Sequence, residues 1–334
     1  MFNLLKSIKN GSDAAVLMYH RITDSSVDPW QLAVSPQNFD GQLKVLNKNY
    51  RVIAVEELLH QLKLNKVKSK TVCLTFDDGY LDNYLNAKPL LEKYNCPATF
   101  FIPPYYIKMR KAFWWDELLT LILFSPKLPE YIYIRKGELS YKRQVTEKAN
   151  MTSPKDNLDS WVWDQPYPTE RCEIYMELWA ILQPLPIDEI ENCLAQLHAS
   201  IAEPATVPLN DRAMSVAQLN DLTNNASFKA GIHTMTHPAL AHHKKAEQEK
   251  ELLTCKAELQ DQLNQSTSVA AYPYGNFNEV TLQIMNENHL TAGFTTKAQL
   301  VNSKSDLFKL GRFHVTNQNQ YDFEQQMKQW FSKR

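Results

Sequence analysis

Short apolar runs alternate with helical patterns along most of this chain. Seven runs rich in apolar and β-branched residues have the length of strands. They are Ala14–Tyr19, Arg51–Val55, Thr71–Phe76, Ala98–Ile102, Phe228–Ile232, Val269–Tyr272 and Thr291–Thr295. Strands that alternate with helices are typical of βα units, in which helices cover a parallel sheet. The pattern therefore predicts an α/β fold.

The segments between these runs contain helix signals. Ser35 and Pro36 form a plausible N-cap and first-turn pair, followed by Phe39, Leu43 and Leu46 on a single helical face. Two later segments repeat the helical spacing, with Leu252, Leu259 and Leu263 in one and Val280 and Ile284 in the other. We expect these helices to cover the sheet.

The segment 104–214 breaks the alternation and is long for one connection in a barrel, so it is predicted to be an insertion. Helical patterns occur around Asp116–Phe124 and Glu170–Leu182. The segment contains five of the seven tryptophans, namely Trp114, Trp115, Trp161, Trp163 and Trp179. They could form the core of a helical subdomain, which we favour, or stack on sugar rings along a groove.

Composition excludes several classes of function. A chain of 334 residues can form one domain with an insertion. Its 36 Lys and Arg against 37 Asp and Glu provide no field to attract nucleic acid, so we expect no nucleic-acid partner. It has only 8 Gly and no glycine-rich phosphate-binding motif, which argues against nucleotide cofactors.

The sequence also predicts a cytoplasmic location. The five cysteines are odd in number and scattered, as expected for reduced thiols. The start of the sequence lacks the apolar core of a signal peptide, and we expect no membrane span, which needs roughly 18 apolar residues. Peripheral membrane contact through a short helix is a further possibility, suggested by Phe2, Leu4, Leu5 and Ile8. The oligomeric state is not encoded in any pattern that we recognise.

Polar residues with catalytic potential follow several predicted strands. His20 follows the first strand, Asp77 and Asp78 the third, His233 the fifth, and Tyr274 the sixth. The carboxyl ends of parallel strands in a barrel share one face, where active sites are built. These side chains are therefore predicted to converge.

His233 and His237 have the i, i+4 spacing that would direct two imidazoles to one side of a helical turn. One carboxylate of the Asp77–Asp78 pair could complete a three-ligand metal site with a position open for water. The other carboxylate would be free to act as a base.

The motifs around these residues resemble one known family. They are Leu17-Met18-Tyr19-His20-Arg21-Ile22, Thr75-Phe76-Asp77-Asp78-Gly79, Ala98-Thr99-Phe100-Phe101-Ile102, His233-Thr234-Met235-Thr236-His237 and Tyr272-Pro273-Tyr274-Gly275. In this order they resemble the polysaccharide deacetylases, carbohydrate esterase family four, in the branch with an N-terminal Tyr-His element. The resemblance covers roughly residues 14–103 and 228–315. It implies a distorted (β/α)7 barrel, here with a helical, aromatic-rich insertion.

The resemblance also implies roles for individual residues. Asp77 would be the catalytic base, and Asp78, His233 and His237 would hold a divalent metal. Zinc is the default metal, and cobalt, nickel or iron would also suit two histidines and one aspartate. The backbone N–H of Tyr274 would stabilise the oxyanion.

This chain departs from the family pattern at one position. Most relatives have an arginine two residues before the Pro-Tyr pair, where it orients the base, but here that residue is Ala271. Arg312 could supply the missing charge from another strand end, or it could be an exposed surface arginine.

Two histidines are candidates for the general acid, because a histidine can hold and release a proton near neutral pH. His314 follows Leu310 in an element that resembles the family's Leu-x-x-His but is one residue longer. His20 lies in the Tyr-His element to which the resembling branch assigns this role. We expect His20 to be the acid.

Together these features predict a metal-dependent hydrolase that removes N-acetyl groups from a sugar of a polysaccharide, oligosaccharide or lipid-linked glycan. Two alternatives remain open. The enzyme could act on another amide or an O-acetyl ester, because such machinery recognises the acyl group. A catalytically silent carbohydrate-binding relative is suggested by the absent arginine, although the retained Asp77 argues against it.

Overall fold

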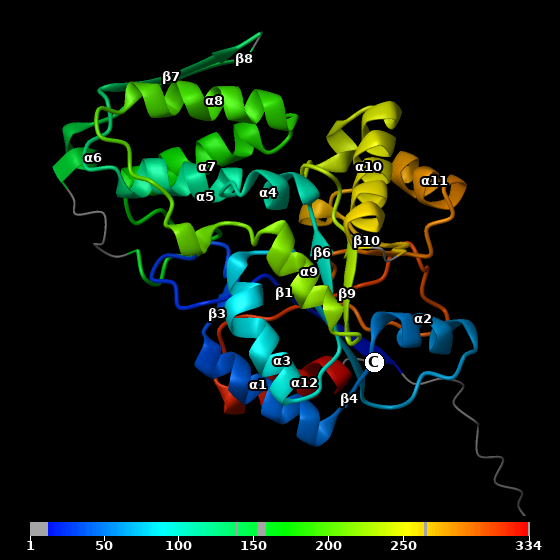
Figure 1. The fold of residues 1–334 in the computed structure, drawn as a ribbon. Coiled ribbons are helices and arrows are strands. Elements are labelled where there is room, and N and C mark those ends of the chain that lie inside the picture. The colour runs from blue at the N-terminus through cyan, green and yellow to red at the C-terminus, as the bar shows by residue number, and fades with distance from the viewer. Residues whose placement is uncertain (1–12, 138, 152–157, 264–265, 333–334) are drawn as a thin grey trace, which may run out of the picture.

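The computed structural model describes residues 13–137, 139–151, 158–263 and 266–332 (Figure 1). Within them, a curved parallel sheet forms the centre of the fold. Its strands in spatial order are β11 (Ala292–Phe294), β10 (Val269–Ala271), β9 (Phe228–Ile232), β6 (Ala98–Ile102), β5 (Thr71–Phe76), β1 (Ala14–Tyr19) and β12 (Phe313–His314). This is the predicted distorted (β/α)7 barrel.

The prediction was wrong about which strands complete the barrel. The expected strand at Arg51–Val55 is reduced to β4 (Arg51–Val52), which pairs only with the start of β5. The remaining place is taken by β12, which pairs with β1. The segment before it closes the barrel, because Leu310 N donates to Gly293 O and Thr295 N donates to Leu310 O on the β11 side. A strand of two residues is too short to show an alternating pattern.

Helices cover the sheet as the apolar spacing predicted. They are α1 (Pro36–Asn49), α2 (Val55–Lys63), α3 (Lys88–Lys93), α9 (Val216–Asn224), α10 (Lys245–Leu263), α11 (Glu279–Glu287) and α12 (Gln320–Ser332). The Ser35 hydroxyl accepts a hydrogen bond from Asn38 N at the start of α1, which confirms the predicted cap. None of the helices in the described residues is long and apolar enough to cross a membrane.

Alternate residues of β1 belong to two cores. Ala15, Leu17 and Tyr19 join the core between the sheet and its helices, whereas Ala14 and Val16 join the core inside the barrel. Successive strand residues point to opposite faces, so a buried parallel strand is apolar throughout. This is why these strands read as continuous apolar runs.

The segment 104–214, predicted as an insertion, forms a helical layer at one end of the barrel (Figure 1). Its elements are α4 (Pro104–Met109), α5 (Trp114–Leu119), the π-helix η2 (Thr120–Phe124), β7 (Tyr131–Lys136), β8 (Leu139–Gln144), α6 (Glu147–Met151), α7 (Glu170–Leu182), α8 (Ile187–Ser200) and η3 (Leu209–Asp211). The antiparallel hairpin β7–β8 was not expected. Because this layer shares one continuous core with the barrel, the limits of the insertion stay a prediction.

The shorter elements lie in connections around the barrel. They are β2 (Arg21–Ile22), β3 (Ala33–Val34), the π-helix η1 (Asn83–Ala87), η4 (Leu240–His242) and η5 (Pro273–Gly275).

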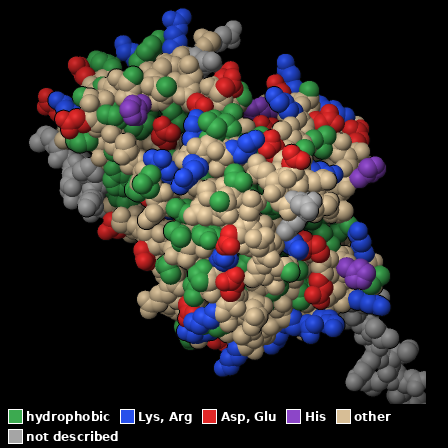
Figure 2. Space-filling model, viewed as in Figure 1, with side chains coloured by type: hydrophobic (Ala, Val, Ile, Leu, Met, Phe, Trp, Pro, Cys, Tyr) green, Lys and Arg blue, Asp and Glu red, His purple; other side chains and the backbone are tan. Residues whose placement is uncertain are grey.

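All five cysteines lie in the described part of the chain, where each is buried and none forms a disulfide. Acidic and basic side chains are interspersed on the face shown in Figure 2. The apolar N-terminal residues for which we considered membrane contact lie outside the described residues.

Candidate metal centre

The predicted site residues converge at the carboxyl ends of the barrel strands. One cleft of about 380 Å³ is lined by all of them, namely His20, Asp77, Asp78, His233, His237 and Tyr274. They follow β1, β5, β9 and β10 in the chain, so the topology of a parallel barrel brings them together. His314, after β12, lines the same cleft.

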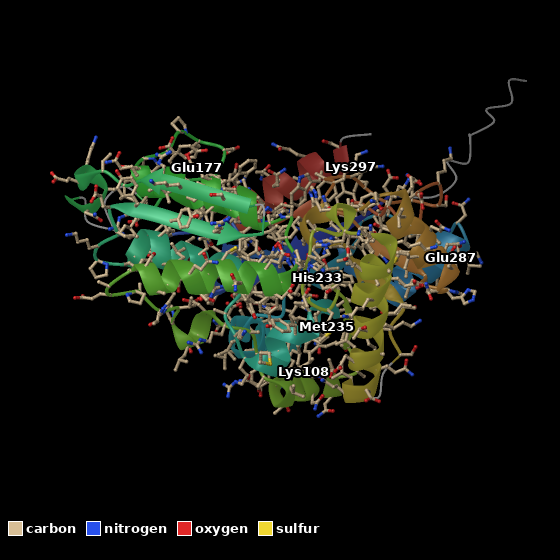
Figure 3. The ribbon with its side chains drawn as sticks, turned by 90° about the horizontal axis from the view of Figure 1, so that it is seen from above. Lys108, Glu177, His233, Met235, Glu287 and Lys297 are labelled. Atoms are coloured by element: carbon tan, nitrogen blue, oxygen red, sulfur yellow. The ribbon has the colours of Figure 1, made fainter. Side chains whose placement is uncertain are left out.

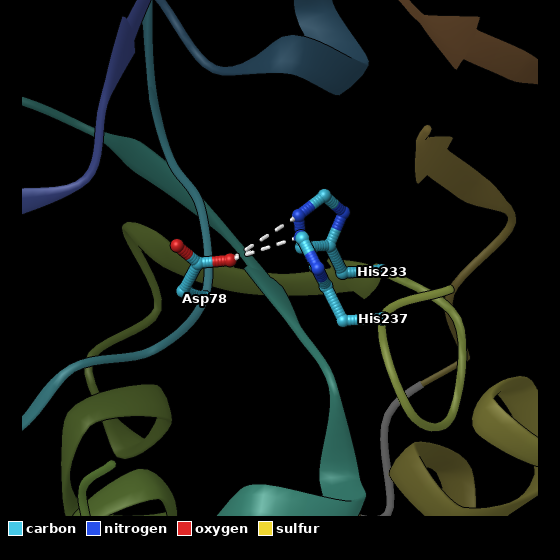
Figure 4. A group of neighbouring side chains, drawn as sticks. All are labelled: Asp78, His233 and His237. Atoms are coloured by element: carbon cyan, nitrogen blue, oxygen red, sulfur yellow. Dashed lines mark ion pairs between the residues drawn. The ribbon is translucent and has the colours of Figure 1, made fainter. Parts of the chain in front are cut away.

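Asp78, His233 and His237 form a buried three-ligand group (Figure 4). Asp78 Oδ1 lies 3.5 Å from His233 Nε2 and 3.3 Å from His237 Nε2. His233 Nδ1 lies 2.8 Å from the carbonyl oxygen of Ala271. This contact places the proton on Nδ1 and leaves the Nε2 lone pair directed at Asp78, as in metal-binding histidines.

The group fits a divalent cation. Asp78 Oδ1 is buried and has no hydrogen-bond partner among the described residues, so a cation would satisfy it. Burial lowers the pKa of His237 to about 3, which keeps its imidazole in the neutral form that binds metals. A buried set of two imidazoles and one carboxylate is typical of catalytic zinc sites.

The histidine pair does not lie on a helical turn, contrary to our prediction. Residues 233–237 form a loop in which Thr234 and His237 have φ angles of +60° and +62°. The Thr234 hydroxyl accepts a hydrogen bond of 3.0 Å from His237 N. A tight loop, and not a helical turn, therefore brings the ring centroids of the two histidines to 4.7 Å from each other.

Glu251, on α10, holds this loop, in which His233 and Met235 are labelled in Figure 3. Its carboxylate accepts hydrogen bonds of 2.8 Å from Met235 N, Thr236 N and the Thr236 hydroxyl. No sequence pattern marked Glu251 as functional, because a glutamate on an amphipathic helix is normally a solvated residue.

The turn Asp77-Asp78-Gly79 directs both carboxylates into the cleft. Asp78 and Gly79 have φ angles of +72° and +76°, in the left-handed region. A Cβ on Gly79 would lie 2.7 Å from Ile102 Cδ1, so only glycine fits without movement of the neighbouring side chain. Asp78 has no such freedom, and its strained backbone is typical of functional sites.

Arg312 takes the place of the arginine that the family pattern has at the position of Ala271. Its guanidinium is fully buried and donates two hydrogen bonds of 2.7 Å to Asp77, one to each carboxylate oxygen. Burial raises the pKa of Asp77, but the charge and hydrogen bonds of Arg312 and the charges of the neighbouring histidines together outweigh burial, so the net pKa lies below its ordinary value. The alternative of an exposed surface arginine was wrong.

Both candidate acids lie beside this pair. His20 Nε2 is 3.9 Å from Asp77 Oδ2, and the His20 and His314 rings are 5.7 Å apart. Asn83, in η1, donates a hydrogen bond of 2.7 Å to the carbonyl oxygen of His20. Burial lowers the pKa of both histidines, that of His314 to about 4. The choice of His20 as the acid stays a prediction.

The tryptophans of the insertion divide between two roles. Trp114, Trp115 and Trp161 are buried, as expected for a core. Trp115 also packs against His237, with ring centroids 4.7 Å apart. Trp163, Trp179 and the buried Trp115 line the cleft, where the groove alternative placed aromatic side chains.

Tyr274 lies beside the metal ligands. Its ring is 4.6 Å from that of His237, and its hydroxyl accepts a hydrogen bond of 3.2 Å from Trp114 Nε1. Its φ angle of +57° is strained for a tyrosine. The insertion thus fixes the side chain of the residue whose backbone N–H was assigned to the oxyanion.

Comparison with known proteins identifies relatives of this arrangement. The family model for polysaccharide deacetylases matches residues 64–122 and 203–293. YxkH of Bacillus subtilis strain 168, assigned to the polysaccharide deacetylases, is 39% identical over 89 residues, covering 26% of this chain and 30% of that protein. The poly-β-1,6-N-acetyl-D-glucosamine N-deacetylase of Staphylococcus aureus strain MSSA476 is 32% identical over 104 residues, covering 27% of this chain and 36% of that protein. The matches thus span about a third of these relatives.

Solved structures share the fold over nearly the whole chain. The Streptococcus pyogenes deacetylase PplD, in complex with acetate, has a TM-score of 0.57 and 21% identity, with 95% of this chain and 99% of that chain covered. IcaB from Ammonifex degensii has a TM-score of 0.55 and 20% identity, with 96% and 98% covered. At this identity the likeness establishes the fold alone.

Proposed function

Because the chain belongs to the polysaccharide deacetylase family, we propose that it is a metal-dependent hydrolase that removes N-acetyl groups from a glycan sugar. The observation that carries the proposal is the pairing, in one cleft, of a buried Asp-His-His group with an aspartate held by a buried arginine. The glycan is a polysaccharide, an oligosaccharide or a lipid-linked glycan.

The residues of the cleft divide the chemical work of amide hydrolysis. A divalent cation held by Asp78, His233 and His237 would polarise the amide carbonyl and lower the pKa of water at the site. Asp77, kept ionised by Arg312, accepts the proton of the attacking water. His20 then donates a proton to the departing amine.

The oxyanion that develops on the carbonyl needs a donor fixed in advance. The backbone N–H of Tyr274 serves this role in our proposal. The support is local rigidity, because the strained Tyr274 backbone is followed by Gly275, whose N donates a hydrogen bond of 2.8 Å to Tyr272 O. Zinc remains the metal of choice, with cobalt, nickel and iron as competitors.

Of the two alternative functions, a different acyl substrate stays open, and the catalytically silent relative has lost its support. Hydrolysis of another amide or of an O-acetyl ester uses the same residues, so substrate tests must decide it. The silent-relative alternative rested on the missing arginine. Arg312 supplies that charge, so the observation that favoured a silent protein no longer does so. The cytoplasmic location stays a prediction.

The proposal is tested by metal analysis and by acetate release from N-acetylated glycan oligomers of several linkages. His237→Ala should lose most bound metal and activity together, because two ligands rarely hold zinc tightly. Asp77→Asn should keep the metal while kcat falls by about 10²- to 10⁴-fold. Full metal occupancy in His237→Ala would refute the ligand assignment. Metal loss in Asp77→Asn would mean that the two aspartates have exchanged roles.

A further inference from the structure

Three indole rings form a continuous aromatic wall from the metal centre to the surface. Trp179 meets Tyr274 edge-on at 6.0 Å, Trp30 lies 4.6 Å from Trp179, and Trp163 stacks on Trp30 at 5.6 Å with an interplanar angle of 24°. All three line the cleft that contains Asp77 and the three-ligand group. We call Trp30, Trp163 and Trp179 the aromatic wall.

The chain holds this wall in place through contacts between segments distant in sequence. Trp163 N donates a hydrogen bond of 3.0 Å to the carbonyl oxygen of Pro29, which ties the insertion to the loop between β2 and β3. Trp30 Nε1 donates one of 2.7 Å to the Tyr175 hydroxyl on α7. The Asp28 carboxylate fixes the same loop by accepting from Leu32 N and Ala33 N. The wall is therefore rigid before any ligand binds.

Trp163 forms the outer end of the wall, and its side chain is exposed to solvent, unlike that of a core residue. Trp163 is 48% exposed, whereas Trp115, which packs on His237, is 5% exposed. A large apolar ring held rigidly at the mouth of a polar cleft is a stacking surface for the apolar face of a pyranose ring. The position of Trp163 at the far end of the wall places that surface away from the reacting acetyl group.

The charge of the cleft restricts the sugar. Among the described residues that line it, none is Lys or Arg, while Asp77 and Asp78 contribute carboxylates. Apart from the proposed divalent cation, phosphate and uronate groups would find no lysine or arginine there, the side chains that normally recognise anions. Neutral N-acetylated hexosamines, and the amine product, match this lining.

We propose that the aromatic wall is a subsite for the sugar ring attached to the residue that is deacetylated. The preferred substrate is then a neutral N-acetylhexosamine chain of two or more residues, and a free monosaccharide is a poor one. This inference rests on the proposed deacetylase function. All three tryptophans lie outside residues 64–122 and 203–293, which match the family model.

Trp163→Ala tests the subsite, because an exposed side chain can be removed with little effect on folding. We expect kcat/KM for tetrameric N-acetylglucosamine chains, β-1,4- and β-1,6-linked, to fall roughly three- to tenfold through KM. Activity on free N-acetylglucosamine and on 4-nitrophenyl acetate should not change. Trp163→Phe should restore most of the loss. Tyr167→Ala is the matched control, since Tyr167 is 49% exposed on the same segment but packs on Trp161 and is not among the cleft-lining residues.

Calorimetric binding of the same tetramers separates the subsite from catalysis. Weaker binding by Trp163→Ala than by the wild type supports the subsite even if no acetate is released, in which case only the proposed function fails. Equal activity losses on tetramer, monosaccharide and 4-nitrophenyl acetate would show a structural role for Trp163 and overturn the subsite. So would a wild-type protein that binds neither tetramer more tightly than the monosaccharide.

Discussion

Arg312 and Asp77 form a buried ion pair whose energetics can be predicted. Both side chains are almost inaccessible, at 0% and 3% exposure, and they share two hydrogen bonds of 2.7 Å. Removing one partner of such a pair leaves an uncompensated buried charge and typically costs about 3–5 kcal/mol. We therefore expect Arg312→Met to lower the free energy of unfolding by about that amount.

Removal of both charges should be much less harmful than the single changes suggest. In Asp77→Asn with Arg312→Met, neither charge remains to be solvated, and a neutral amide takes the place of the carboxylate. The double-mutant cycle should give a coupling energy of at least about 2 kcal/mol. The Arg312 contacts with Thr295 O and the Thr75 hydroxyl are lost in both backgrounds, so the cycle cancels them.

The assay is urea unfolding of the four proteins, together with metal content and kcat on an N-acetylated oligomer. Arg312→Met should keep bound metal, because Arg312 is not among the three ligands, while kcat falls by about 10²- to 10⁴-fold with the base unpositioned. The kcat of Arg312→Lys should lie between those of the wild type and Arg312→Met. Lysine keeps the positive charge but cannot donate two parallel hydrogen bonds to the carboxylate.

Arg171→Met is the matched control. Arg171 is also buried, at 3% exposure, but donates to backbone carbonyls, including those of Ile122 and Ser125, and to the Asn150 side chain. Its loss should destabilise the fold without rescue by Asp77→Asn and with kcat preserved. Additive stabilities in the Arg312 cycle, or a wild-type kcat in Arg312→Met, would refute the assignment of Arg312 as the residue that positions the base.

Three further predictions concern other parts of the site and its support. His20→Ala should keep its metal and lower kcat on an N-acetyl substrate by about 10²- to 10⁴-fold, with a far smaller loss of kcat on an activated ester. His314→Ala should change kcat less than about tenfold. A larger amide-specific loss for His314→Ala would assign the role of general acid to His314. Glu251→Ala should weaken metal binding about 10- to 100-fold by releasing the histidine loop, and unchanged affinity in a metal titration would contradict this. Burial raises the pKa of Asp116 to about 7, so the folded state keeps a proton that the unfolded state releases above pH 3.8, and stability falls as the pH rises through that window. In Asp116→Asn the side-chain oxygen can still accept the hydrogen bond from the Tyr80 hydroxyl. In urea unfolding, the free energy of unfolding of this variant relative to the wild type should therefore increase by roughly 3 kcal/mol from pH 5 to pH 8. A difference that does not depend on pH would show that Asp116 has an ordinary pKa.

Some features could be predicted from the sequence because their causes are local. The Thr71–Phe76 run is buried throughout and largely apolar, because both faces of a central parallel strand are covered. The Ser35 cap and the apolar face of α1 depend on neighbouring residues only. Convergence of Asp77, Asp78 and His233 follows from their shared position after strands of one parallel sheet.

Other features depended on contacts that no local pattern records. The spacing of His233 and His237 allowed a helical turn, and the loop was decided by the contact with Glu251 on α10. The two tryptophans at 161 and 163 have similar sequence surroundings, but Trp161 is 4% exposed and packs against Tyr175, whereas Trp163 is 48% exposed and stacks on Trp30 at the cleft.

The sequence by itself determined most of the alternating strands and helices, the motif residues and the side chains able to bind a metal, because these follow from periodicity and residue chemistry. Only the tertiary structure decided that Arg312 pairs with Asp77, 235 positions away in the chain. It also decided that β12 completes the barrel and that Trp30 meets the insertion at the cleft. These outcomes depend on which segments distant in the sequence come into contact, and the packing of the whole chain decides those contacts.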